Sequence, residues 1–185
     1  MTFSLIFYII IVEFHEKVSK KMEVCFIGHR DIRKTEELIS SLKETVKLLI
    51  EKGATTFLFG SKSEFDDLAL QIVTEFKKEK AEIKRVYVRS AFQNIDKLYE
   101  EYLLKHYEET YFPQKIEKAG KYSYVERNYE MINRATYCIF YYNENNFDLQ
   151  NNANKECFYL ARKSGTQVAY NYAVKKKKKI INLCK

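Results

Sequence analysis

Three short stretches of the chain combine glycine with hydroxyl or basic side chains where a helix is expected to begin. They are Gly28-His29-Arg30, Gly60-Ser61-Lys62-Ser63 and Ser164-Gly165-Thr166. A helix amino terminus carries unpaired N–H groups and a partial positive charge, so it stabilises a phosphate without any side chain. Glycine lets a ligand approach the backbone closely, and serine or threonine adds a hydroxyl donor. Together the three stretches predict contacts to the phosphates of a nucleotide.

Helix capping is the competing interpretation for two of these stretches. Ser63 followed by Asp66, and Ser164 followed by Gln167, each fit a capping box, which needs no ligand. For either stretch alone, capping is the better explanation. The stretches favour a binding site only jointly, because ligands of open α/β sheets bind beyond the carboxyl ends of the strands.

Two arginines could neutralise the charge of a phosphate. Arg30 follows the glycine that ends an apolar run, and Arg127 lies in a helical segment with Asn128 and Met131 close by on the helix. A guanidinium can bind phosphate through two N–H groups, although a lone arginine in a helix is more often a solvated surface residue. His29 could act as an acid or base, but a histidine directly after a strand more often forms a hydrogen bond or a turn.

Glu64 and Asp66 are the candidate catalytic carboxylates. They could bind ribose hydroxyls or act in catalysis, and they equally fit the first turn of a helix, where acidic groups complement the dipole. The four cysteines show no CxxC spacing and are expected as free thiols in a reducing cytosol. No HExxH, Walker A, GxGxxG or Ser-His-Asp arrangement is legible, so the sequence predicts no metal site and no certain cofactor.

Apolar periodicity alternates between strands and helices along the chain. Compact β-branched and aromatic runs predict strands over residues 24–27, 55–59, 84–88, 137–142 and 179–183. Apolar residues at helical spacing predict helices over residues 35–52, 64–80, 96–107, 125–134 and 167–176. This order predicts an α/β fold with a mostly parallel central sheet, right-handed crossovers and helices on both faces.

Length and composition indicate one domain, residues 22–185, because 185 residues with 46% hydrophobic content suffice for a single α/β core. Residues 3–12 are almost wholly apolar, but they are roughly half of the ~20 residues that a membrane helix needs. Residues 1–21 are therefore expected to be an N-terminal extension without a membrane span. Residues 90–121 are expected to form one side of the pocket or a lid, and residues 144–154 a polar loop.

The positive charge of the chain is concentrated in one place. The formal net charge is +7, and residues 175–179 are five consecutive lysines. Without them the balance is near neutral, which favours a local anionic ligand over a body-wide nucleic-acid surface.

Several motifs together resemble the SLOG superfamily, which unites DprA-like DNA-processing proteins, Lonely Guy phosphoribohydrolases and YpsA-like proteins. The resemblance covers nearly all of residues 22–183. The motifs that carry it are Cys25-Phe26-Ile27-Gly28-His29-Arg30, Phe57-Leu58-Phe59-Gly60 with Glu64-Phe65-Asp66, Arg85-Val86-Tyr87-Val88, Glu126-Arg127-Asn128 with Met131, and Ser164-Gly165-Thr166 with Tyr172-Ala173 and Ile180-Ile181-Asn182-Leu183.

This resemblance implies a Rossmann-like, three-layer fold that binds a nucleotide or a nucleotide-derived ligand similar to ADP-ribose or NAD, in some bacterial relatives as a sensor. The arginine of the Lonely Guy Glu-Arg-Lys motif matches Arg127, which implies phosphate binding. The catalytic glutamate of that branch matches Ala169, which argues against N-glycosidic hydrolysis. The stretch from Gly60 to Ser63 has fewer glycines than its counterpart in the family.

The leading hypothesis is a cytoplasmic module that binds a nucleotide, and whether it has an enzymatic activity stays open. Two alternatives stay open: a nucleotide N-glycosidase that uses Glu64 or Asp66, and single-stranded DNA binding as in the DprA branch. Self-association is also open. The expected ligand-binding residues are Gly28, His29, Arg30, Gly60, Ser61, Glu64, Arg127, Asn128, Met131, Ser164, Gly165 and Thr166.

Overall fold

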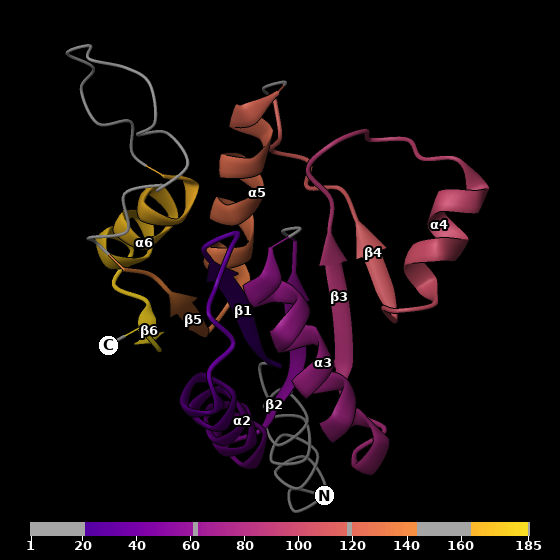
Figure 1. Cartoon of the computed structure of the whole chain (residues 1–185). Coiled ribbons are helices and arrows are strands. Elements are labelled where there is room, and N and C mark those ends of the chain that lie inside the picture. The colour runs from indigo at the N-terminus through magenta and orange to yellow at the C-terminus, as the bar shows by residue number, and fades with distance from the viewer. Residues whose placement is uncertain (1–20, 61–62, 118–119, 144–163, 185) are drawn as a thin grey trace, which may run out of the picture.

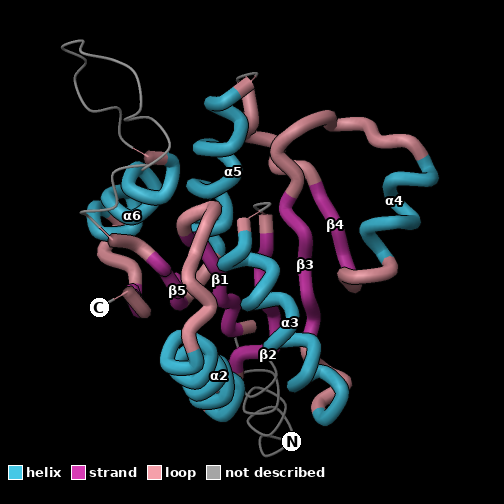
Figure 2. Tube along the Cα trace, viewed as in Figure 1, coloured by secondary structure: helices cyan, strands magenta, loops and turns pink. Residues whose placement is uncertain are grey.

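A computed structural model describes residues 21–60, 63–117, 120–143 and 164–184. Six strands form one sheet in the order β4-β3-β2-β1-β5-β6, and every neighbouring pair is parallel (Figures 1 and 2). The α/β fold predicted from the sequence is confirmed. The strands are β1 (Met22–Gly28), β2 (Ala54–Phe59), β3 (Lys84–Val88), β4 (Glu109–Tyr111), β5 (Tyr137–Tyr141) and β6 (Lys179–Asn182).

Helices cover both faces of the sheet and make it the middle of three layers. The helices are α2 (Glu36–Glu51), α3 (Glu64–Glu79), α4 (Lys97–Leu104), α5 (Lys121–Arg134) and α6 (Gly165–Lys175). One hydrophobic core joins α2 and α3 to the sheet through Val24 and Phe26, and a second joins α5 and α6 to it through Cys25 and Ile27. Successive residues of β1 point to opposite faces, so a strand buried on both sides is a continuous apolar run.

Side-chain caps begin four of the helices, as the sequence indicates for three of them. Thr35, Ser63, Asp96 and Ser164 each accept a hydrogen bond from the backbone N–H three residues later, at 2.8 to 3.2 Å. Such a cap stabilises a helix by about 1 kcal/mol. Gly53 follows α2 with a φ of +96°, a conformation that glycine adopts without strain.

Several predicted boundaries are wrong. Helix α5 begins at Lys121 rather than at residue 125, and α6 begins at Gly165 rather than at residue 167. Helix α4 is shorter than residues 96–107, and strand β4 lies within residues 90–121, where no strand is predicted from the sequence. Strand β4 has three residues and pairs with β3 alone, so only the tertiary pairing shows that it is a strand.

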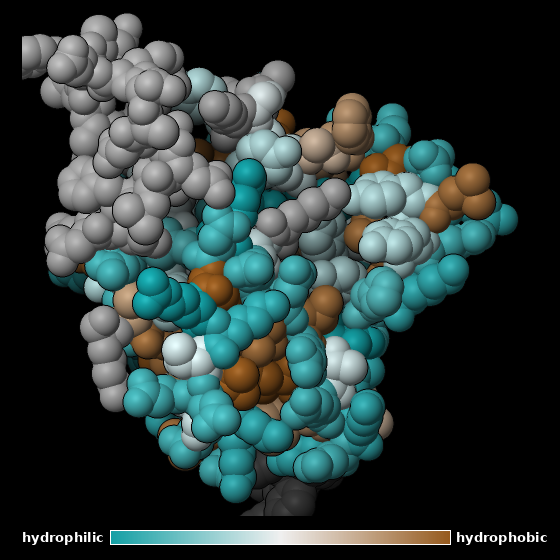
Figure 3. Space-filling model, in the orientation of Figure 1, coloured by the Kyte–Doolittle hydropathy of each residue, from teal (hydrophilic) through white to brown (hydrophobic). Residues whose placement is uncertain are grey.

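Helix α4 is the least buried of the described helices. Leu103 is its buried residue, whereas Leu98 and Tyr102 are exposed. Figure 3 shows hydrophobic residues at the surface in the region of this helix. No described helix is both long and apolar enough to cross a membrane. The apolar stretch at residues 3–12 and the predicted loop at residues 144–154 lie outside the described part of the chain.

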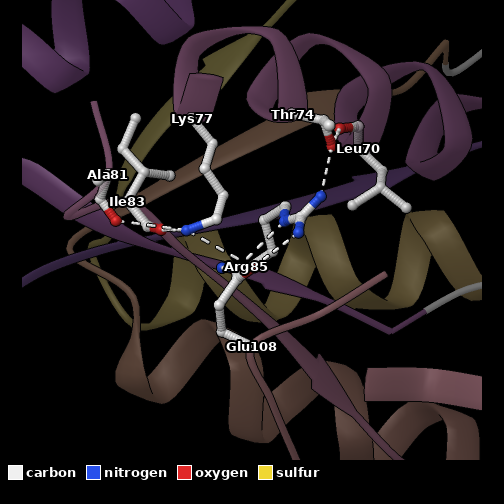
Figure 4. Close-up of polar contacts among 7 residues, drawn as sticks. All are labelled: Leu70, Thr74, Lys77, Ala81, Ile83, Arg85 and Glu108. Carbon is white, nitrogen blue, oxygen red and sulfur yellow. Dashed lines mark hydrogen bonds and ion pairs between the residues drawn. The ribbon is translucent and has the colours of Figure 1, made fainter. Parts of the chain in front are cut away.

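Ion pairs bind the elements together at the edge of the sheet where the strands begin, called the amino edge below. Arg85 of β3 donates to Glu108 through Nε and Nη2 at 3.2 and 2.6 Å and to Thr74 of α3 at 2.9 Å (Figure 4). Lys77 lies 3.6 Å from the same carboxylate. Arg134, at the end of α5, donates to both carboxylate oxygens of Glu23 in β1, at 2.9 and 2.5 Å.

Candidate functional site

The opposite edge of the sheet, called the carboxyl edge below, gathers most of the residues expected to bind a ligand. The chain adds β2, β3 and β4 on one side of β1 and then returns to add β5 and β6 on the other. The switch between β1 and β5 is where open α/β sheets hold their ligands. Gly28 ends β1 at this point, and Gly60 directly follows the end of the neighbouring strand β2.

The first cluster of predicted residues joins β1, β5 and α6. The Thr166 hydroxyl donates to the Gly28 carbonyl at 3.0 Å, so the amino terminus of α6 lies against the end of β1. Ser164 caps this helix, and a Cβ placed on the exposed Gly165 would meet nothing within 4 Å. No described residue therefore fills the space beside Gly165 at the beginning of α6.

His29 belongs to the same cluster and holds a structural hydrogen bond. Its ring is buried, and Nε2 accepts from the backbone N–H of Asn143 at 3.0 Å. The His29 backbone N–H in turn donates to the Tyr141 carbonyl at 3.2 Å. This nitrogen must carry no proton to accept the bond, so His29 joins the ends of β1 and β5 as a neutral imidazole.

The second cluster joins β2 to α5. Arg127 is buried, with 3% of its surface exposed, and its Nη1 donates to the Gly60 carbonyl. Nε and Nη2 both donate to Asn128 Oδ1 at 3.1 Å, and the guanidinium lies 5.6 Å from the centre of the Tyr124 ring. Met131 is also buried against Gly60.

Glycine is needed at residues 28 and 60 because other side chains pack directly against them. A Cβ on Gly28 would lie 2.5 to 2.6 Å from atoms of Phe65, and a Cβ on Gly60 would lie 2.6 Å from Arg127 Cδ. Neither glycine has a positive φ. The close approach that the sequence analysis assigned to a ligand is made here by side chains of the protein itself.

The amino terminus of α3 is largely occupied by internal hydrogen bonds. The Glu64 N–H donates to the Arg30 carbonyl, and Glu64 Oε2 accepts from the Ile32 N–H, both at 2.8 Å. The Ser63 hydroxyl accepts a hydrogen bond from the backbone N–H of Asp66. The exposed side chain of Glu64 thus fastens the β1–α2 loop to α3, and the Arg30 side chain lies exposed on that loop. Ser61 lies outside the described residues.

Asp66 places a negative charge close to Arg127. Its side chain is 3% exposed, and its charge acts on Arg127, Tyr87 and Tyr107. Burial lowers the pKa of Arg127, and the charge of Asp66 opposes that shift. Burial also raises the pKa of Tyr87 to about 12, so Tyr87 is a neutral hydrogen-bonding group.

Tyr87 and Tyr124 are neighbours of Arg127 that were not predicted from the sequence. The helical spacing of Tyr124 and Arg127 signals the second contact, because residues three apart lie on one face of a helix. Tyr87 comes from the end of β3, and nothing in the sequence places it near Arg127 before the order of the strands is known.

Neither a protein-family model nor a curated protein sequence matches this chain. Among solved structures, the chain is similar to DNA processing protein A from Helicobacter pylori, whose structure is described for its single-stranded DNA binding mode. The TM-score is 0.53 at 17% identity, and the match covers 86% of this chain and 63% of the other. The shared fold is a Rossmann-like α/β domain. This chain therefore spans less than two thirds of the length of that protein.

The lysine run lies at the other edge of this Rossmann-like domain. Residues 175–179 lead from the end of α6 into β6, at the amino edge of the sheet. Lys178 donates to the carbonyls of Asn133 and Ala135 at 2.8 and 2.9 Å, which caps the carboxyl terminus of α5. These lysines are thus separated from the candidate site by the length of the strands.

Two buried cysteines lie between the clusters and the amino edge. Cys25 and Cys138 are partners in register on β1 and β5, and their thiols hydrogen bond to one another. Both are free, as expected, and the described residues contain no group of three or more metal-ligating side chains.

Proposed function

We propose that this protein is a SLOG-like module that binds a nucleotide-derived ligand at the carboxyl edge of its sheet. The observation that carries the proposal is Arg127, a buried cation whose hydrogen bonds go to the neutral oxygens of Gly60 and Asn128. A buried charge is costly unless it is compensated. Among the described residues, Asp66 compensates it through space alone, so we expect this edge to attract an anion.

Other residues at this edge can contact the phosphate and ribose groups of such a ligand. The start of α6, from Ser164 to Thr166, offers backbone N–H groups to a phosphate beside Gly28. The exposed side chain of Arg30 adds a second positive charge at the rim, and the exposed carboxylate of Glu64 is placed to accept a ribose hydroxyl. A cytoplasmic location and self-association remain predictions from the sequence.

Thermal-shift measurement with a panel of nucleotides tests this proposal. We expect ADP-ribose, NAD or a nucleoside phosphate to raise the melting temperature, because a ligand that binds only the folded state stabilises it. Mass spectrometry of small molecules released from natively purified protein would identify a ligand that stays bound. No shift and no released ligand across the panel would contradict the proposal.

Hydrolysis is the weaker alternative. Ala169, at the position that matches the catalytic glutamate of the Lonely Guy branch, lies on the buried face of α6 in the hydrophobic core. Glu64 already binds the Ile32 N–H. Release of free base from nucleoside monophosphates or NAD, abolished by Glu64→Gln, would favour the enzyme over the binding module.

Single-stranded DNA binding is favoured by one observation, the exposed aromatic side chains near the carboxyl edge. Phe92 follows the end of β3, and Tyr122 and Tyr124 lie in the first turns of α5. Aromatic rings beside basic groups can stack with unpaired bases. A shift of labelled oligonucleotide that weakens steeply with salt and disappears in Phe92→Ala with Tyr122→Ala would support this function.

A further inference from the structure

The two arginines of α5 have opposite kinds of partner, although they lie two helical turns apart. Arg134 forms an ion pair with both oxygens of the Glu23 carboxylate at the amino edge. Arg127, at the carboxyl edge, donates to a backbone carbonyl and a side-chain amide oxygen. A cation that donates hydrogen bonds to neutral oxygens of its own protein holds those groups in place, whether or not it also binds a ligand.

Arg127 and Gly60 fit together in shape as well as through the hydrogen bond. A Cβ on Gly60 would lie 2.6 Å from Arg127 Cδ, 2.8 Å from its Nε and 2.8 Å from Met131 Sδ. Any side chain at residue 60 would therefore displace the arginine. Glycine at residue 60 therefore leaves the space that the Arg127 side chain fills.

The position of Gly60 is passed on to the rim of the candidate site. Gly60 follows β2, and α3 begins four residues later at Glu64. Glu64 bonds the β1–α2 loop twice, through its N–H to the Arg30 carbonyl and through its carboxylate to the Ile32 N–H. Because Gly60 and Glu64 are four residues apart in the chain, we expect a displacement of Gly60 to weaken the bonds between Glu64 and this loop.

Three of the five guanidinium N–H groups of Arg127 are engaged by Gly60 and Asn128. The side chain is held from two sides and lies near the Tyr124 ring. Its surface is 3% exposed, which leaves little room for a phosphate against it.

We propose that Arg127 is a positioning residue that fixes the β2–α3 junction through the Gly60 carbonyl, and does not itself hold the phosphate of the ligand. The effect that we expect on ligand affinity rests on the proposed function, whereas the effect that we expect on the β2–α3 junction does not. The two effects are therefore measured separately.

Hydrogen exchange measures the junction without any ligand. We expect Arg127→Met to accelerate amide exchange at the end of β2 and in the first turn of α3 by about tenfold, because a hydrogen bond from a charged group is lost. Arg127→Lys keeps the charge but lacks the planar guanidinium that donates to Gly60 and Asn128 from separate nitrogens, so it should not restore full protection. Arg134→Met, the matched control on the same helix, should leave exchange at this junction unchanged.

Milder variants keep the measurement informative if Arg127→Met does not fold. Asn128→Ala removes one acceptor of the guanidinium, and Gly60→Ala displaces it, so each should accelerate exchange at the same amides. Unchanged exchange in Arg127→Lys and Asn128→Ala would overturn the inference.

Affinity for a nucleoside and for its mono- and diphosphate separates positioning from phosphate contact. Positioning predicts that Arg127→Lys, which keeps the charge that attracts an anion, weakens all three by the same factor, and that Gly60→Ala combined with it adds no further loss. Affinities of Arg127→Lys equal to those of the parent, or a loss in this variant that grows with the number of phosphates, would overturn the inference. If the parent protein binds none of the three, the proposed function fails for this ligand class, and hydrogen exchange alone decides the role of Arg127.

Discussion

The two edges of the sheet use positive charge in different ways. At the amino edge, Arg85 and Lys77 share the Glu108 carboxylate, and Arg134 binds Glu23. At the carboxyl edge, Arg127 is more deeply buried, yet its hydrogen bonds go to Gly60 and Asn128. At the amino edge, Arg85 and Arg134 are neutralised by direct contact with carboxylates, whereas Arg127 has only the through-space charge of Asp66 among the described residues.

This difference indicates which edge serves stability and which is available for function. Ion pairs that are complete within the chain gain nothing from a ligand. A buried cation bonded to neutral oxygens lowers the free energy of an anion placed nearby, particularly where water is partly excluded. The comparison therefore predicts that substitutions at the amino edge change stability alone, whereas those at the carboxyl edge also change binding.

Gly28→Ala should have the largest effect on stability, because the new Cβ would overlap the ring of Phe65 at 2.5 Å. Phe65 is fully buried and stacks on Tyr141, so it cannot move aside. We expect a loss of about 3 kcal/mol in the free energy of unfolding, measured by chemical denaturation. Gly165→Ala is the matched control and should change stability by less than about 0.5 kcal/mol. Equal effects of the two substitutions would contradict the packing at Gly28.

Glu108→Gln should lower stability by about 2 kcal/mol at neutral pH, because charged hydrogen bonds to Arg85 are lost. Burial alone would raise the pKa of Glu108, but the hydrogen bonds and charge of Arg85, helped by Lys77, outweigh it and lower that pKa. The carboxylate therefore stabilises the fold above the unfolded pKa of about 4.3, and this contribution is lost as the pH falls through the folded pKa. Denaturation curves of parent and variant should converge in acid. A difference that stays constant below pH 4 would show that the ionised form of Glu108 is not what matters.

Lys178→Met should have the smallest effect, about 1 kcal/mol, because it removes the cap on the last carbonyls of α5. Lys175→Met, in the exposed last turn of α6, is the control and should be close to neutral. Neither substitution should alter nucleotide affinity if the lysine run lies apart from the site. Loss of affinity in both variants, with stability unchanged, would place the ligand at the amino edge.

Most of the fold could be predicted from the sequence because local signals agree with the tertiary structure. The apolar run at Val24 to Ile27 is buried on both faces, and Thr35, Ser63 and Ser164 cap helices at the expected places. Strand β4 could not be predicted, because three residues without an apolar pattern become a strand only through pairing with β3.

The candidate site could be predicted only in outline. Glycines at strand ends signalled the carboxyl edge correctly, but their neighbours depend on the order of strands and on the faces of α3 and α5. The sequence could not show that Phe65 fills the space beside Gly28 or that Arg127 fills the space beside Gly60. An arginine that donates to a backbone carbonyl of its own protein cannot be told from an arginine that binds a phosphate by the residues around it in the sequence.

Selective ¹⁵N-glycine labelling offers the most direct measurement of the central claim, because the chain has five glycines. Gly28, Gly60 and Gly165 lie at the carboxyl edge, and Gly53 lies at the amino edge between α2 and β2. During titration with ADP-ribose, NAD and nucleoside phosphates, we expect the amide signals of the first three to move with one common dissociation constant while Gly53 stays in place. No movement with any of these ligands, or movement of Gly53 alone, would contradict a nucleotide site at this edge.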